Sequence, residues 1–67
     1  MPPPDLASLA DMLFAARTIL EYLDKVTSEA FYADAIRRDA VVRQMEIIGE
    51  AARRVSEVTR QRVPQLP

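Results

Sequence analysis

Two carboxylates and a guanidinium stand about one helical turn apart in the segment RDAVVRQMEIIGEAARRVSE, residues 38–57. Arg43, Glu46 and Glu50 follow one another at intervals of three and four residues, which places them on one face of a helix. The two glutamates repel each other at that spacing, so a cation between them is expected. An arginine of the same helix or of another element could supply it, and adjacent carboxylates can also ligate a divalent metal.

The residue types that are absent narrow this chemistry. The 67 residues contain no histidine and no cysteine, which excludes a Glu-x-x-His di-iron site, thiol catalysis and nearly all zinc sites. The serines have no imidazole to activate them, and the single glycine leaves no glycine-rich phosphate loop. From the residues alone we predict no catalytic constellation, no metal and no cofactor in this chain.

Apolar spacing predicts a first helix over about residues 5–26, with Asp5 as its N-cap. A heptad-like stripe is formed by Leu6, Leu9, Leu13, Ala16, Leu20 and Leu23, and it is widened on one flank by Met12, Ile19 and Val26. The next segment breaks this pattern. Thr27 is expected to cap a short helical turn from Ser28 to Tyr32, with Phe31 and Tyr32 closing the end of the bundle.

A second helix is predicted from about residue 34 or 35 to Arg62, where Pro64 stops it. Its first apolar stripe consists of Val41, Met45, Ile48, Ala52 and Val55, and a second consists of Ala40, Ile47, Ala51 and Val58. Two adjoining stripes imply neighbours on two sides. Gly49 costs about 1 kcal/mol in a helix interior, so we expect a close helix crossing there. Val41, Met45, Ile48, Gly49 and Ala52 are therefore the predicted crossing or dimer residues.

These elements predict an all-α fold, an antiparallel helical hairpin with a short connecting helix. A chain of 67 residues buries too little surface to be a stable monomer without help. We expect a four-helix-type bundle, formed by dimerisation or with a missing C-terminal half. Residues 1–34 carry a charge of 2 − 6 = −4 and residues 35–67 one of 7 − 4 = +3, so the two arms can pair with each other.

The chain is expected to be one helical domain, residues 1–67, behind a disordered proline leader, residues 1–4. The sequence shows no signal peptide and no apolar run long enough to span a membrane. A cytoplasmic location without membrane contact is the resulting expectation.

The segment AVVRQMEIIGEA, residues 40–51, is the most specific part of a resemblance that covers nearly the whole chain. Together with EYLDKVTSEAFYAD and RVPQLP, it resembles the N-terminal half of HepT-like proteins, small all-helical members of the HEPN superfamily. The matching positions are Arg43, Glu46, Ile47, Ile48, Gly49, Glu50 and Ala51. Gln44 and Met45 depart from the Asn and Leu that are more usual there.

The resemblance implies a metal-independent ribonuclease that acts as a homodimer, the toxin of a toxin–antitoxin pair. Its partner would be an MNT-type nucleotidyltransferase antitoxin that transfers AMP to a tyrosine of the toxin. The family's catalytic motif, an Arg followed after four to six residues by His-x-Tyr, would begin after PQLP. We therefore expect an apparently truncated chain that carries the dimerisation and scaffold half and is inactive alone. Arg43, Glu46 and Glu50 match positions expected near the intersubunit cleft.

An alternative is a non-enzymatic helical interaction or regulatory module, which homodimerises or binds a partner. The observation behind this alternative is the double apolar stripe of the second helix. Direct nucleic-acid binding through the arginines of that helix is a weaker alternative, because glutamates are interspersed among them. RNA is expected as a partner of the full-length family member.

Overall fold

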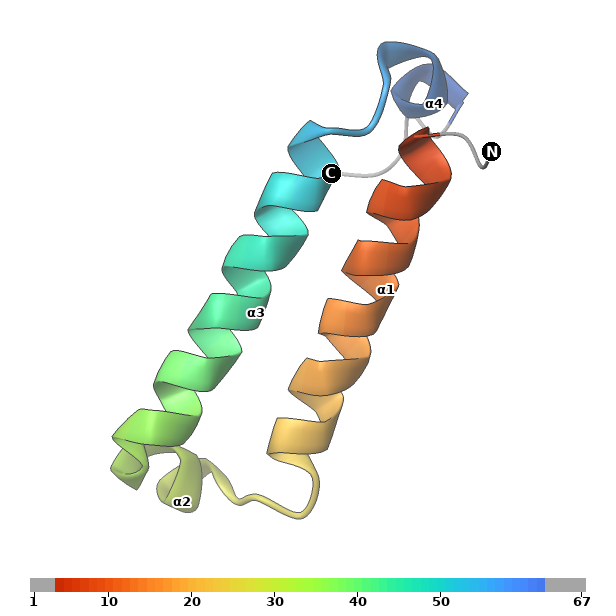
Figure 1. Ribbon diagram of the computed structural model, residues 1–67. Helices are drawn as coiled ribbons and strands as arrows, with labels where there is room; N and C mark the ends of the chain where they lie inside the picture. The colour runs from red at the N-terminus through yellow and green to blue at the C-terminus, as the bar shows by residue number, and fades with distance from the viewer. Residues whose placement is uncertain (1–3, 63–67) are drawn as a thin grey trace.

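The computed structural model describes residues 4–62, in which two long helices lie side by side and antiparallel (Figure 1). The helices are α1 (Pro4–Leu23), α2 (Ser28–Ala33), α3 (Ala35–Arg53) and α4 (Glu57–Arg62). Helix α2 closes one end of the hairpin, and α4 lies at the other end beside the start of α1. The described part of the chain holds no strand, so the predicted all-α fold and antiparallel hairpin are confirmed.

Small side chains bring α1 and α3 together. Ala15 of α1 is 1% exposed and Ala51 of α3 is 0% exposed, and Ser8 of α1 and Val41 of α3 are also buried. Helices whose facing residues are small can approach closely, because no long side chain separates their backbones. The buried alanines therefore belong to the packed faces of the two helices. Gly49 is not packed against α1, since a Cβ built there would meet only the Arg53 guanidinium.

The leucine stripe of α1 does not face α3. Leu6, Leu13 and Leu20 are 54%, 54% and 68% exposed, whereas Met12 and Ile19 on the predicted flank are half-buried. Successive residues of a helix point about 100° apart, so the leucine stripe and the alanine and serine face cannot both point toward α3. The alanine and serine face makes the α1–α3 contact. The regular leucine spacing thus marks a face that α3 leaves open.

Each of the two apolar stripes predicted for the second helix contributes to the α1 contact. Val41 comes from the first stripe and Ala51 from the second, and both are buried. Ile47, Ile48 and Val55 are half-buried. Met45, in contrast, is 59% exposed. The packed face of α3 therefore lies between the two stripes, and the outer part of the first stripe stays uncovered.

Helix α1 begins at Pro4, one residue before the predicted start, and ends at Leu23 rather than near Val26. The end follows from Lys25, whose φ of 58° lies in the left-handed region that an α-helix cannot continue through. Asp5 is therefore inside the helix and is not its N-cap, which corrects the prediction. Pro4 belongs to the helix as well, and residues 1–3 of the predicted leader lie outside the described residues.

Side-chain caps define the connection between the long helices: the Thr27 cap was predicted, and the Asp34 cap was not. Thr27 Oγ1 accepts a hydrogen bond from the Ala30 N–H at 3.1 Å, and an Asp34 carboxylate oxygen accepts one from the Arg37 N–H at 3.0 Å. Phe31 is half-buried, but Tyr32 is 73% exposed, so Tyr32 does not close the bundle. Adjacent residues of a helix point about 100° apart, and α2 can turn only one of them inward.

The predicted continuous helix to Arg62 is wrong, because the chain bends between Arg53 and Glu57. The Arg60 guanidinium donates hydrogen bonds to the carbonyl oxygens of Ala52 and Arg53, at 3.3 and 3.0 Å. These are carbonyls that a helix end leaves without intrahelical partners. Side-chain capping therefore stabilises the end of α3 at the bend.

Asp5 ties α4 to the first turn of α1. Its carboxylate accepts hydrogen bonds from the Ser56 N–H at 2.9 Å, from the Ser56 hydroxyl, and from the Thr59 hydroxyl at 2.6 Å. The Ser56 hydroxyl bond, then those from Thr59 and the Ser56 backbone, hold the pKa of Asp5 below its usual value of 3.8. Asp5 thus serves the bend at Ser56 rather than the start of its own helix.

None of helices α1 to α4 combines the length and the apolar character that crossing a bilayer requires; this finding covers the described residues only.

Replacing Ala15 by Leu should lower the free energy of unfolding by about 1–3 kcal/mol, because the larger side chain cannot fit against α3. Ala10→Leu on the same helix is the matched control: Ala10 is exposed, so its change should stay within about 0.5 kcal/mol. Urea denaturation followed by circular dichroism measures both. Equal effects of the two variants would mean that α1 does not pack on α3 through Ala15.

Asp5→Asn should destabilise the fold at neutral pH and abolish one component of its pH dependence. Because folding lowers the pKa of Asp5 from 3.8, its contribution is present above that pH and is lost as the pH falls through the folded-state pKa. Wild type and variant should therefore converge in stability in acid. Glu21→Gln, which removes another exposed carboxylate of α1, is the matched control and should keep the wild-type stability at neutral pH in the same denaturation series.

Candidate functional site

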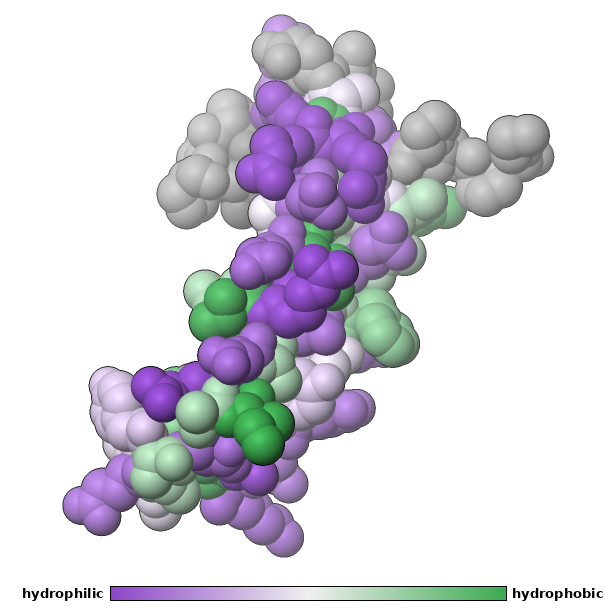
Figure 2. All heavy atoms as spheres, turned by 60° about the vertical axis from the view of Figure 1, so that its left-hand side comes forward, coloured by the Kyte–Doolittle hydropathy of each residue, from purple (hydrophilic) through white to green (hydrophobic). Residues whose placement is uncertain are grey.

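The three residues that the sequence singled out lie around one depression on α3. Arg43, Glu46 and Glu50 line it together with Gly49 and Arg53, and its volume is about 310 Å³. All four charged side chains are exposed, because they project from the part of α3 that α1 does not cover. Figure 2 brings the α3 side of the hairpin forward and shows hydrophilic side chains along it, interrupted by hydrophobic ones. The depression is an open, charged surface.

An arginine of α3 pairs with one of the two glutamates, as the sequence allowed. Arg43 Nη1 lies 3.6 Å from Glu46 Oε2, with both side chains about two-thirds exposed. Arg54, at the end of α3, contacts Asp11 Oδ2 of α1 at 3.4 Å. The first contact stays within α3, whereas the second joins the two long helices. Such exposed pairs contribute at most about 1 kcal/mol each, so Arg43 and Glu46 add little to the fold.

Gly49 is the one uncharged residue that lines this depression. A Cβ built at Gly49 would lie 3.9 Å from Arg53 Nη1, an ordinary van der Waals distance. The Arg53 guanidinium thus lies near the glycine backbone. No described segment of the same chain crosses α3 there. A crossing at Gly49 between two copies of the chain stays a prediction.

The remaining predicted crossing residues divide between two surfaces. Val41 is buried and Ile48 half-buried, so both are used inside the hairpin. Met45 is 59% exposed and Ala52 is exposed. Only these two and Gly49 are open to a further chain, which reduces the surface that α3 itself can offer.

The depression presents two guanidinium groups and two carboxylates, with a formal charge of 2 − 2 = 0. Guanidinium groups bind phosphate or carboxylate oxygens, and the carboxylates can hold another arginine, histidine or hydroxyl by charge-assisted hydrogen bonds. These four side chains are therefore suited to binding and orienting charged groups or hydroxyls of another molecule. The residues for nucleophilic catalysis, an imidazole or a thiol, are not among the 67.

A second polar cluster was missed in the sequence analysis: Asp5, Ser56, Thr59 and Arg60 at the α3–α4 bend. Ser56 is an N-cap of the short helix α4, because its hydroxyl accepts a hydrogen bond from the Thr59 N–H at 3.3 Å. A serine before a new helical turn is a recognised start signal. The apolar period that continues through Val55 concealed it.

The sequence of the chain is similar to those of known proteins. Residues 12–65 match the family described as "Ribonuclease HepT-like". Two proteins of Methanocaldococcus jannaschii are similar to the chain. "Putative RNase MJ1380" is 34% identical over 61 residues, which are 91% of this chain and 56% of that protein. "Putative RNase MJ0127" is 34% identical over 68 residues, which are 100% and 56%.

The chain therefore spans 56% of the length of each of these relatives. No solved structure matches it. The charged depression lies entirely inside the segment that matches the family.

Glu46→Ala should change the free energy of unfolding by less than about 0.5 kcal/mol, since its ion pair is exposed. Asp34→Ala is the contrasting variant: it removes the carboxylate that caps the start of α3 and should cost about 0.5–2 kcal/mol. Thermal unfolding of both variants tests this difference. A large loss for Glu46→Ala would assign that residue to the fold and leave the depression without a separate role.

Proposed function

The chain belongs to the HepT-like ribonuclease family, and from this membership we propose that it is part of an RNA-cleaving toxin in a toxin–antitoxin system. The observation that carries the proposal is the family match over residues 12–65, which includes the whole charged depression. Its partner is an MNT-type nucleotidyltransferase antitoxin, and both act in the cytoplasm. The substrate is RNA, without a metal or cofactor.

In this proposal Arg43, Glu46 and Glu50 are positioning residues. Their side chains are exposed and available to orient the catalytic Arg and His of the family motif. Carboxylates that accept hydrogen bonds from those groups would fix them relative to the RNA phosphate. The 67 residues contain no histidine, so the chain alone has no imidazole to take a proton from the attacking hydroxyl.

A chimera tests the role of the depression. Residues 1–67 would replace the aligned part of the relative MJ0127, whose alignment covers 100% of this chain. Glu46→Gln and Glu50→Gln in the chimera should each lower the rate of RNA cleavage about tenfold to a hundredfold, as misplaced catalytic groups do. Glu29→Gln on α2, outside the depression, is the matched control and should cleave at the parent rate.

The isolated 67-residue chain should show no cleavage in the same RNA assay. Clean cleavage by it, abolished by a ribonuclease inhibitor, would contradict the assigned roles. So would a chimera in which Glu46→Gln and Glu50→Gln act as fast as Glu29→Gln. The toxin–antitoxin role has its own check, a neighbouring gene for a small nucleotidyltransferase whose co-expression relieves growth arrest.

One observation favours a second candidate, a non-enzymatic interaction module. Large apolar side chains of α1, among them Leu6, Leu13 and Leu20, are more than half exposed, which suits a helix that binds other helices. The chimera separates the two functions, because a pure interaction module would fold in it without supporting cleavage.

A further inference from the structure

We propose that Asp5 is a latch that selects between two conformations of residues 50–62, the bend between α3 and α4 and one continuous helix. In the bent conformation α4 lies beside the start of α1 (Figure 1). In the continuous conformation α4 would extend α3 along the α3 axis. The latch is a property of the 67-residue chain itself and does not depend on RNA cleavage.

The residues at the bend do not require it. The segment EAARRVSEVTRQR, residues 50–62, contains neither proline nor glycine, the residues that fit a helix interior worst. Most of its members are alanine, arginine, glutamate or glutamine, which favour a helix, and its apolar spacing continues from Ala52 through Val55 to Val58. Ser56, as an N-cap, is the local signal for the bend. Local preference thus permits both conformations, and a contact from another element can decide between them.

The hydrogen bonds at the bend are those of a continuous helix with the partners exchanged. In a continuous helix the Ser56 N–H would donate to the Ala52 carbonyl oxygen, four residues earlier. At the bend the Ser56 N–H donates to Asp5 Oδ1 at 2.9 Å, and the Arg60 guanidinium donates to the Ala52 carbonyl oxygen at 3.3 Å. Two side chains therefore satisfy the two backbone groups that one helical hydrogen bond would satisfy. Conformations that both satisfy these groups can lie close in free energy.

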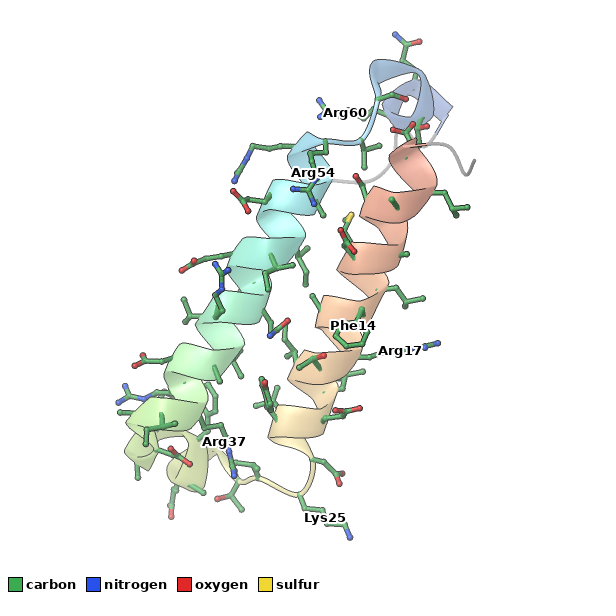
Figure 3. All side chains as sticks on the ribbon, in the orientation of Figure 1. Phe14, Arg17, Lys25, Arg37, Arg54 and Arg60 are labelled. Atoms are coloured by element: carbon green, nitrogen blue, oxygen red, sulfur yellow. The ribbon has the colours of Figure 1, made fainter. Side chains whose placement is uncertain are left out.

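Asp5 is the part of this exchange that comes from α1. Its carboxylate also accepts hydrogen bonds from the Ser56 and Thr59 hydroxyls. Arg60, in contrast, belongs to the segment itself, and Figure 3 shows it at the bend. The hydrogen bonds from Ser56 and Thr59 are the larger causes of the lowered pKa of Asp5, and the positive charge of Arg60 adds to them.

Loss of the Asp5 carboxylate therefore acts on one conformation only. The bent conformation loses the three hydrogen bonds that Asp5 accepts from Ser56 and Thr59. The continuous helix loses none of its backbone hydrogen bonds, because its Ser56 N–H is paired with Ala52. Removing Asp5 should thus shift the population from the bend to the continuous helix.

The latch also sets the direction in which the chain continues after α4. This consequence rests on the proposed function, in which the family's catalytic motif follows α4 along the chain. Asp5 would then be a positioning residue for that motif, since it fixes where α4 ends relative to the charged depression. Asp5 would act through the direction of α4 and not through contact with RNA.

NMR spectroscopy of the 67-residue chain tests the latch. In the wild type, the Ser56 Cα and Cβ chemical shifts should be those of an N-cap residue, whose backbone is extended. In Asp5→Ala they should move to helical values, with the Cα resonance downfield. Asp11→Ala is the matched control, because it removes the other α1 carboxylate that contacts the end of α3. Its Ser56 shifts should stay those of the wild type.

Glu57→Pro distinguishes a latch from a general loss of stability. Glu57 is the first residue of α4, a position that proline favours. In a continuous helix, proline there would lack the N–H donor and clash with the Arg53 carbonyl group. Asp5→Ala combined with Glu57→Pro should therefore return Ser56 to N-cap shifts while α4 stays helical. Asp5→Ala with unchanged Ser56 shifts, or with non-helical shifts over residues 57–62, overturns the proposal.

The same variants in the MJ0127 chimera test the consequence for cleavage. Asp5→Ala should lower kcat at least about tenfold with little change in KM, and adding Glu57→Pro should restore kcat. Asp11→Ala should cleave at the parent rate. Unchanged kcat in Asp5→Ala would contradict the positioning role. A parent chimera without activity would contradict the proposed function instead, and the Ser56 shifts of the 67-residue chain would still decide whether Asp5 is a latch.

Discussion

A narrow seam of small residues is the constraint on which the rest of this structure depends. Ala15 and Ala51 are almost completely inaccessible, while no large side chain is fully buried among the described residues. Alanine side chains bury little area, so the contact brings α1 and α3 close together but contributes little hydrophobic free energy. The cost is that the leucines of α1 cannot reach α3. Exposure of the leucine row is thus a direct consequence of how the two helices meet.

Polar contacts at the ends compensate for the thin seam by fixing register. Asp34 caps the start of α3, Asp5 holds the bend at Ser56, and Arg54 reaches across to Asp11. Each such bond contributes about 1 kcal/mol or less on an exposed surface. Their directionality matters more than their strength, because a slide of α3 along α1 would break the Asp5–Ser56 and Asp11–Arg54 contacts.

The hairpin, the Thr27 cap and the grouping of Arg43 with Glu46 and Glu50 were predictable because each depends on residues three or four apart. The bend near Ser56 was not, since it requires Asp5, which lies 51 positions earlier. The buried face of α1 was also misjudged. Periodicity identifies a stripe that needs cover, but it does not say which neighbour provides it, and the alanines beside the leucines carried no stronger signal. The charged depression came from local spacing, with Arg53 as an addition.

Gly49 belongs to the charged depression and not to the contact between the two long helices. It lines the depression with Arg43, Glu46, Glu50 and Arg53, and a Cβ built there would meet only Arg53 Nη1, at 3.9 Å. A glycine in a helix interior costs about 1 kcal/mol relative to alanine, and the described hairpin does not need it for packing. In the proposed function, the absence of a side chain at this position keeps the depression open to the groups that Glu46 and Glu50 orient.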